Sequence, residues 1–396
     1  MDKEQKLESL INIGIELNQV KDLDILMEKI LGAARRFVNA DAGSIYIREN
    51  DNLKFSYTQN ATLQKKLPEG AKLIYSTFTI PINTNSIAGY AAATGETLNI
   101  GDVYKLDGAT PYKFSRSFDD QSGYRTASVL TIPLKTLRNE ILGVLQIINA
   151  QDKDHAIIPF SNFDEKGMHH FAGIASMALE RAQLTRGILL QMIRMAEMRD
   201  PKETGAHVNR VASYAVEIYQ EWARRRNIPS REVDVKRDIL RMAAMLHDVG
   251  KVAISDTILK KPGRFTDEEF SIMKQHTIHG ARLFLDQNSE FAEAALDVAL
   301  NHHERWDGKG YPGHDLSGVC CPKQGEQIPL FGRIVAIADV YDALVSVRCY
   351  KDSWDEEKAF RILREEAGRQ FDPELIEIFF ASLESIQAIK FRYPES

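Results

Sequence analysis

Histidines are concentrated in the second half of this 396-residue sequence, and carboxylates stand beside several of them. Seven of the ten histidines lie within residues 207–314. His247 is followed by Asp248 at the end of an apolar helical run, and His302 is followed by His303 at the end of another. Mixed imidazole and carboxylate ligands suit divalent iron, manganese or zinc, and no cysteine lies near His247 to build a structural thiolate zinc site. The spacing therefore predicts a metal centre at helix ends.

Two further residues support a metal centre. His276 falls on another amphipathic helical pattern, and Asp339 interrupts the apolar run Arg333–Leu344. An aspartate in so apolar a helix needs a compensating partner, because a buried unpaired carboxylate is costly. Asp248 is a carboxylate that can bridge, as a site with two ions about 3.5 to 4 Å apart requires. Any single histidine has an ordinary structural explanation, but the combination favours metal binding.

The elements that must position these residues change character near residue 165, from strand-like runs to helical patterns. We expect strands at 44–48, 53–57, 78–82, 128–134 and 142–148, and a helix at 86–94. From Asp164 to Arg199 the apolar spacing predicts one connecting helix, too apolar to stand alone in water. We expect it to pair with its copy in a homodimer that also involves the strand-rich first half of the chain, and packing against a domain of the same chain is the alternative. The fold class is therefore α+β: a mixed sheet with flanking helices, a connecting helix and an all-α second half.

Composition limits the classes of protein that fit. At 44% hydrophobic and 27% charged residues, the sequence is ordinary for a folded chain. No apolar run approaches the ~20 residues of a membrane span. The mixed charges of residues 1–6 predict no export signal, and three cysteines predict no disulfide framework, so we expect a cytoplasmic protein. A net charge of −6 with mixed signs predicts no nucleic-acid polymer as a partner.

The first half resembles a GAF domain, a small-molecule sensor module. The resemblance rests on Thr79–Pro81, Ser86–Tyr90, Gly95–Ile100, Ser128–Leu134 and Leu142–Gln146. Residues of a fuller GAF signature are also present, namely Asn149, Phe160, Asp164 and Glu165, whereas Ala150 replaces a lysine. The resemblance implies an unidentified GAF ligand, and a spacer or dimerisation module without a ligand is the alternative.

The second half is similar to an HD-GYP domain, the cyclic di-GMP phosphodiesterase branch of the HD superfamily of metal-dependent phosphohydrolases. The matching segments are His207–Val211, His247–Lys251, Lys261–Thr266, His276, His302–Pro312 and Ala338–Leu344. We therefore expect a GAF domain with an N-terminal helix at 1–163, a connecting helix at 164–199 and an HD-GYP domain at 200–396.

The HD-GYP resemblance implies a set of functional residues. Its metal ligands are His207, His247, Asp248, His276, His302, His303 and Asp339. Lys251, Arg348 and Lys351 match positions that hold the substrate phosphate, and Gly310, Tyr311 and Pro312 form the substrate-binding loop that names the family. Asp248 and Lys251 are assigned catalytic roles. His279 has no role in the family pattern and is interpreted as a surface or supporting residue.

Glu203 has two interpretations. It can complete a capping box after Asp200 and Pro201, where the sequence predicts a helix start. It also stands four residues before His207, on the same helical face, and in some HD-GYP enzymes a glutamate here helps to bind a third metal. We therefore expect two or three divalent ions, with iron preferred and manganese or another divalent metal as alternatives.

The predicted function is metal-dependent hydrolysis of cyclic di-GMP to pGpG or GMP, regulated by the GAF domain. The alternatives are a non-catalytic cyclic di-GMP receptor and a phosphohydrolase of another cyclic dinucleotide. The complete ligand set favours the enzyme. One departure from the family is the long loop Gly313–Gly332, which directly follows the substrate-binding loop and contains adjacent cysteines.

Overall fold

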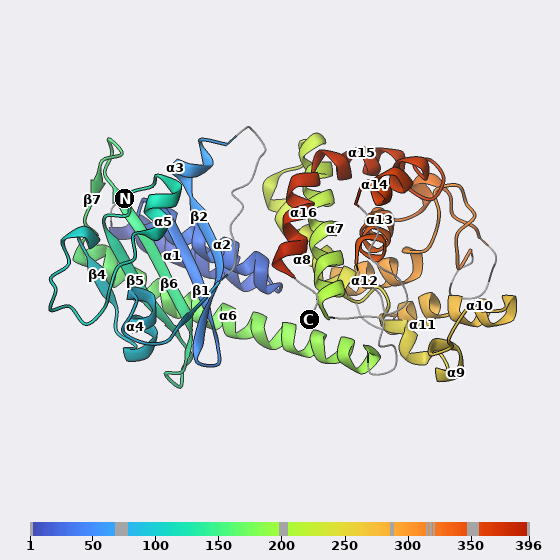
Figure 1. The fold of residues 1–396 in the computed structure, drawn as a ribbon, viewed down its shortest axis with the longest axis horizontal. Helices are drawn as coiled ribbons and strands as arrows, with labels where there is room; N and C mark the ends of the chain where they lie inside the picture. Colours follow the sequence, from blue (N-terminus) through green and yellow to red (C-terminus); the bar gives the residue numbers. More distant parts are fainter. Residues whose placement is uncertain are drawn as a thin grey trace. The chain divides into compact units, whose positions relative to one another are not determined.

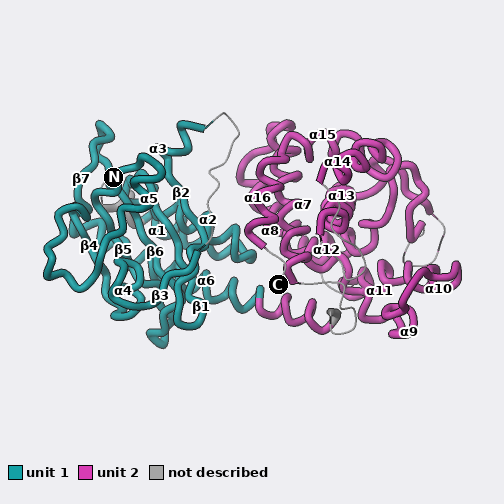
Figure 2. Tube along the Cα trace, in the orientation of Figure 1, with its two compact units in different colours: residues 1–186 teal, residues 187–396 magenta. Residues whose placement is uncertain are grey.

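The computed structural model describes residues 3–67, 78–197, 205–285, 289–313, 316, 319, 321–346 and 356–393. The chain divides into two compact units, residues 1–186 and 187–396 (Figure 2). The first unit contains a sheet with helices and the second is helical, which confirms the expected α+β class (Figure 1). Among the described residues, no helix combines the length and the apolar character needed to cross a bilayer.

A seven-stranded sheet forms the centre of the first unit. Its order is β3-β2-β1-β6-β5-β4, and β7 pairs with β6. Every pair of described strands is antiparallel, where the sequence analysis expects a mixed sheet. The strands are β1 (Ala40–Glu49), β2 (Asn52–Asn60), β3 (Thr79–Pro81), β4 (Leu98–Ile100), β5 (Val129–Lys135), β6 (Ile141–Gln151) and β7 (Ile157–Ile158). The register places Ile45, Leu145 and Ile132 in one buried apolar row across three strands.

Helices α1 (Lys3–Gln19), α2 (Leu23–Phe37) and α6 (Asn162–Glu197) contribute to the apolar layer on that row. α2 begins after Asp22, whose carboxylate accepts hydrogen bonds from the backbone N–H groups of Asp24 and Ile25 at 2.9 and 3.1 Å. These amides have no partner within the helix, so the cap defines where α2 starts. On the other face, α4 (Ile87–Thr94) covers Tyr46. Short helices α3 (Ala61–Gln64) and α5 (Ser117–Ser122) and the 3₁₀ turn η1 (Val103–Lys105) complete the unit.

The partial GAF signature has a structural role in this unit. Asn149 is buried, and its side-chain amide donates a hydrogen bond to the Tyr124 hydroxyl at 2.9 Å. Ala150 offers no charge to the carboxylates that open α6. The Glu165 carboxylate accepts a hydrogen bond from the Asn99 side chain at 3.0 Å. A neutral amide therefore partners Glu165 in this chain.

The second unit is built from helices and 3₁₀ turns. The helices are α7 (Gly205–Arg225), α8 (Ser230–Met245), α9 (Asp256–Leu259), α10 (Asp267–Lys274), α11 (His276–Arg282), α12 (Glu290–Asn301), α13 (Leu330–Val345), α14 (Glu356–Glu365), α15 (Pro373–Ala381) and α16 (Leu383–Arg392). The 3₁₀ turns are η2 (Val249–Ala253) and η3 (Gly325–Gln327). α13 packs against α7, α12 and α14 (Figure 1). Its buried run Ile334–Ala338 leads directly to Asp339, so an acidic residue follows the apolar part of a central helix.

Candidate metal centre

Most of the predicted metal ligands stand at helix ends. His247 and Asp248 follow α8, His276 opens α11, His302 and His303 follow α12, His207 lies in the first turn of α7, and Asp339 lies within α13. A side chain at a helix end can point into the space between neighbouring helices, so it reaches the other ligands without passing through the packed core. The helical fold thus gathers residues that are far apart in the sequence.

The side chains form two groups, and within each group the possible ligand atoms lie within 4.8 Å of one another. The four-residue group consists of Asp248, His276, His302 and His303, and the three-residue group consists of His207, His247 and Asp339. The structure therefore brings together seven of the eight expected metal ligands. The eighth, Glu203, lies outside the described residues. The sequence order does not show this division, because neighbouring His247 and Asp248 belong to different groups.

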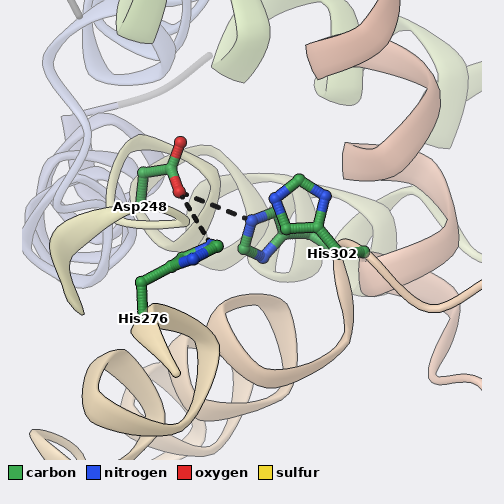
Figure 3. A group of neighbouring side chains, drawn as sticks. Asp248, His276 and His302 are labelled. Carbon is green, nitrogen blue, oxygen red and sulfur yellow. Dashed lines mark ion pairs between the residues drawn. The ribbon is translucent and has the colours of Figure 1, made fainter. Parts of the chain in front are cut away.

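Asp248 lies between the two groups. Its Oδ1 is 3.2 Å from His276 Nε2 and 3.6 Å from His302 Nε2, on the four-residue side (Figure 3). Its Oδ2 is 3.2 Å from His247 Nε2, on the three-residue side. His247 Nε2 is in turn 3.9 Å from Asp339 Oδ1. One carboxylate therefore presents an oxygen to each group, which is the arrangement a bridging ligand requires.

The other ring nitrogen of three histidines is already engaged. Nδ1 of His247 lies 2.8 Å from the carbonyl oxygen of Ala244, and Nδ1 of His276 lies 2.7 Å from that of Met273. His302 Nδ1 lies 3.0 Å from the carbonyl oxygen of Val298. A carbonyl oxygen only accepts, so each Nδ1 carries a proton, and in the neutral imidazole each Nε2 then carries a lone pair. This is the tautomer that binds a metal through Nε2.

The residues present fit a divalent cation. Oδ1 of Asp248 and Nε2 of His276 and His302 are buried and make no hydrogen bond. In each neutral imidazole Nε2 carries a lone pair. Oδ1 of Asp248 therefore faces two other lone pairs, at 3.2 Å on His276 Nε2 and at 3.6 Å on His302 Nε2. Buried polar atoms without partners cost free energy, and a cation among them removes that cost. The donor set is nitrogen and oxygen, which suits iron, manganese or zinc.

The electrostatics of the site keep the ligands in their metal-binding forms. Burial alone would raise the pKa of Asp248, but nearby Lys251 and His247 hold this pKa well below its usual value. Burial lowers the pKa of His302, and it lowers the pKa of His303 further, with help from neighbouring His302 and His276. At neutral pH the carboxylate is therefore ionised and these imidazoles are neutral, as metal ligation requires.

The turn from His247 to Lys251 needs a glycine to reach its position. A Cβ on Gly250 would lie 1.9 Å from the backbone oxygen of His276, so only a residue without a side chain lets this turn approach α11. Lys251 then places its Nζ 2.8 Å from Asp248 Oδ2. The lysine thus brings a positive charge to the carboxylate that joins the two groups.

A loop covers one side of the four-residue group. In this GYP loop, residues 304–313, the Tyr311 ring lies 4.6 Å from the His303 ring between centroids. The Tyr311 N–H donates to the carbonyl oxygen of His303 at 3.2 Å, and the Glu304 carboxylate accepts from the Gly313 N–H at 2.9 Å. Burial raises the pKa of Tyr311, so its hydroxyl keeps its proton at neutral pH. Predicted substrate-binding residues therefore lie against a predicted metal ligand.

Comparison with known proteins agrees with this geometry. The GAF domain family matches residues 22–179, and the HD domain family matches residues 180–375. A protein of Vibrio cholerae serotype O1 named cyclic di-GMP phosphodiesterase is 32% identical over 369 residues, covering 88% of this chain and 71% of that protein. The chain belongs to the HD-GYP family.

Two further relatives match about half of this chain. A cyclic di-GMP phosphodiesterase of Thermotoga maritima is 42% identical over 192 residues, covering 48% of each chain. A 3'3'-cGAMP-specific phosphodiesterase 2 of Vibrio cholerae is 34% identical over 220 residues, covering 56% of this chain and 39% of that protein. The names of these relatives thus contain two different cyclic dinucleotides.

Glu203, Arg348 and Lys351 lie outside the described residues. His279 lies on α11, three residues after His276, and belongs to neither group. Its interpretation as a surface or supporting residue is consistent with its partly buried position.

The long loop after the GYP loop contacts the elements that carry the ligands. Its Cys321 N–H donates to the carbonyl oxygen of Gly313 at 3.0 Å. Lys323 Nζ donates to the side-chain oxygen of Asn301, which directly precedes His302, at 2.6 Å. Leu316 packs against a small apolar cluster that includes Leu300 of α12. The described part of this loop thus braces the end of α12.

One buried pair beside the site, Arg210 and Asp342, is not among the residues predicted from the sequence. Asp342 is fully buried and lies 2.8 Å from His207 through its Oδ2, and Arg210 contacts both of its oxygens. Burial opposes its ionisation, but His207 and Arg210 lower the pKa of Asp342 to about 2. The sequence contains a signal for a buried Asp342, because this aspartate stands one helical turn after Asp339 in the same apolar run and, like it, needs a partner.

We expect Asp248→Ala to remove metal and activity together. Losing the carboxylate between the groups leaves the facing imidazoles without the charge that joins them, so metal content should fall by about one ion per chain or more. Elemental analysis of protein purified without oxygen checks this, with His279→Ala as the matched control that keeps its metal. Wild-type metal content and turnover in the Asp248 variant would refute the site assignment.

Proposed function

We propose that this chain is a metal-dependent phosphodiesterase that hydrolyses cyclic di-GMP. The observation that supports it best is the position of Asp248, whose two oxygens face two separate groups of ligands. Two adjacent cation sites suit phosphodiester hydrolysis, in which charge develops on the phosphate and on the leaving oxygen. The names of two HD-GYP relatives supply the substrate class.

The four-residue group and the three-residue group would each hold a divalent ion, with Asp248 shared. Iron is the preferred metal and manganese the alternative, because the ligands are imidazoles and carboxylates. Bound ions of this kind lower the pKa of water and neutralise phosphate charge. Glu203 would assist a third ion, in keeping with its position four residues before His207.

The chain's own residues would bind the substrate and exclude water. Lys251 carries three donors on its ammonium, so it can keep its contact with Asp248 and still donate to a phosphate oxygen. Tyr311 lies over the His303 ring and shields that ligand on one side. A drier site strengthens the attraction between Lys251 and a phosphate, because charges interact more strongly at low dielectric constant.

The second candidate substrate is 3'3'-cGAMP, favoured by the name of one relative. Both molecules present the same phosphodiester bonds to the metal centre and differ in one base. The described ligand groups therefore do not discriminate between them, and the agreement with the first relative over 88% of this chain favours cyclic di-GMP.

Product analysis on both cyclic dinucleotides tests the proposed function. We expect the metal-loaded chain to convert cyclic di-GMP to pGpG or GMP with a higher kcat/KM than 3'3'-cGAMP, and a chelator to stop both reactions. Chromatography of the products measures this. Tight binding of cyclic di-GMP by fully loaded protein without any product would favour the receptor alternative, and faster turnover of 3'3'-cGAMP would favour the second substrate.

Phosphate recognition by Arg348 and Lys351 can be separated from metal binding. Arg348 offers a planar fork to phosphate oxygens, and Lys351 offers a compact charge. A charged hydrogen bond contributes roughly 1.5 to 3 kcal/mol, so each alanine variant should lose about 10- to 100-fold in kcat/KM for cyclic di-GMP while keeping its metal. Arg361→Ala, at an exposed position of α14, is the control. Unchanged kinetics in both variants would reject the phosphate role.

We assign residues 1–163 to a GAF sensor domain with its N-terminal helix, 164–199 to the connecting helix and 200–396 to the HD-GYP domain. A homodimer would join two copies through the sensor domain and this helix. Four apolar side chains of α1 and α6 support it, because each is more than half exposed: Ile11, Ile15, Met177 and Leu184. Met177 and Leu184 are seven residues apart, the repeat of a two-helix interface. A ligand of the sensor domain would act through this helix.

Leu184→Glu tests the dimer. A charge at the centre of an apolar interface loses its water without gaining a partner, so this variant should be monomeric at micromolar concentrations. Light scattering after size exclusion measures the mass. Leu137→Glu makes the same change at a side chain that is 92% exposed in the β5–β6 turn, and it should leave the mass unchanged. A dimeric Leu184→Glu variant, or a monomeric wild type, contradicts the proposal.

A further inference from the structure

His207 differs from three other histidine ligands in how its Nδ1 is held. His247, His276 and His302 each follow a helical segment and donate to a backbone carbonyl three or four residues earlier. The last carbonyls of a helix have no partner within it, so such acceptors are available there. His207 lies in the first turn of α7, where the unpaired backbone groups are N–H donors. Its own helix therefore offers no acceptor.

A side chain from α13 supplies the missing acceptor. His207 Nδ1 lies 2.8 Å from Asp342 Oδ2, although the two residues are 135 positions apart. His207 Nε2 then faces Asp339 Oδ1 at 3.6 Å, within the three-residue group. A carboxylate accepts and never donates when it is ionised, so it holds the proton on Nδ1 and the lone pair on Nε2.

Arg210 holds the carboxylate in this orientation. Its Nε donates to Asp342 Oδ1 at 2.6 Å, and its Nη2 donates to Oδ2 at 2.8 Å. The same guanidinium donates to the carbonyl oxygen of Tyr393 at 3.1 Å and to the Ser346 hydroxyl at 2.9 Å. Arg210 and Asp342 are both almost completely buried. A two-pronged contact with further anchors leaves the carboxylate little freedom to rotate.

We propose that Asp342, held by Arg210, is the positioning residue that selects the metal-binding tautomer of His207. This inference rests on the metal centre of the proposed function, but not on the identity of the substrate. It predicts that metal affinity depends on whether position 342 offers an acceptor to His207, and not on the charge of the pair.

Two double variants separate the acceptor from the charge. R210M/D342N and R210M/D342L each replace the buried ion pair by neutral side chains of similar size, a change that folded proteins often tolerate. Once Arg210 is gone, the amide that D342N introduces can turn its oxygen toward His207, whereas the aliphatic side chain that D342L introduces has no acceptor. We expect Mn²⁺ to bind R210M/D342L about 10- to 100-fold more weakly than R210M/D342N, the usual effect of losing an outer partner of a ligand.

Calorimetric titration of metal-free full-length protein with Mn²⁺ measures this difference without an activity assay. Far-ultraviolet circular dichroism and melting confirm that each variant is folded. R333M/D372N is the matched control, because Arg333 and Asp372 form another largely buried ion pair in the same unit and belong to neither group. Its affinity for Mn²⁺ should equal that of the wild type. Equal affinity in R210M/D342N and R210M/D342L overturns the proposal.

A second comparison applies if R210M/D342L fails to fold. In D342N alone, the introduced amide has two orientations. If its oxygen faces His207, its NH₂ faces the Arg210 Nε–H, so two donors meet. In the opposite orientation its NH₂ faces the Nδ1–H of His207, and two donors meet there instead. Removing Arg210 ends this conflict, so R210M/D342N should bind Mn²⁺ more tightly than D342N. Weaker or equal binding by the double variant contradicts the tautomer argument. A wild type that binds Mn²⁺ but hydrolyses neither dinucleotide would instead contradict the proposed function alone.

Discussion

The second unit depends on a buried carboxylate surrounded by imidazole lone pairs. Asp248 turns an oxygen toward each of two ligand groups, and the Nδ1 atoms of His247, His276 and His302 are already committed to backbone carbonyls. In the neutral rings their Nε2 atoms therefore carry lone pairs, and exchanging the two tautomers would break those bonds. A cation is the species that satisfies all of these atoms at once. A cation bound there would couple metal binding to folding, because its binding free energy would add to the stability of the unit.

Helix ends are the means by which the fold builds this environment. Where a helix stops just before a histidine, a carbonyl of its last turn has a second lone pair that can orient Nδ1 of that histidine, and the side chain then points beyond the helix. α8 and α12 both use this arrangement. Gly250 allows the turn after Asp248 to lie against α11, where any Cβ would meet the backbone of His276. Ligand position is therefore determined by backbone packing, and the rings have little room to adjust.

Charge compensation extends beyond the ligands. α13 carries a partly buried Asp339 and a fully buried Asp342, and each meets a different partner. Asp339 faces His207 and His247, while Asp342 is neutralised by Arg210. Lys251 balances Asp248 on the other side of the site. Buried acids of this kind are tolerated only where a base or a cation lies within contact distance, so the same contacts that permit the acids also arrange the ligands.

The order of the residues is enough to predict the helical character of the second half, the strand-rich first half and the set of residues able to bind metal. These follow from local periodicity and from residue type, which act over a few positions. The sequence also indicates that Asp339 needs a partner, because an aspartate within an apolar helical run can be recognised from the order of the residues. Tertiary structure alone decided that His247 and Asp248 serve different groups, that every described strand pair is antiparallel, and that Asp342 holds His207 from 135 residues away. Such pairings depend on which helix ends lie close together. The packing of the whole unit determines this, and a local sequence pattern does not contain that information.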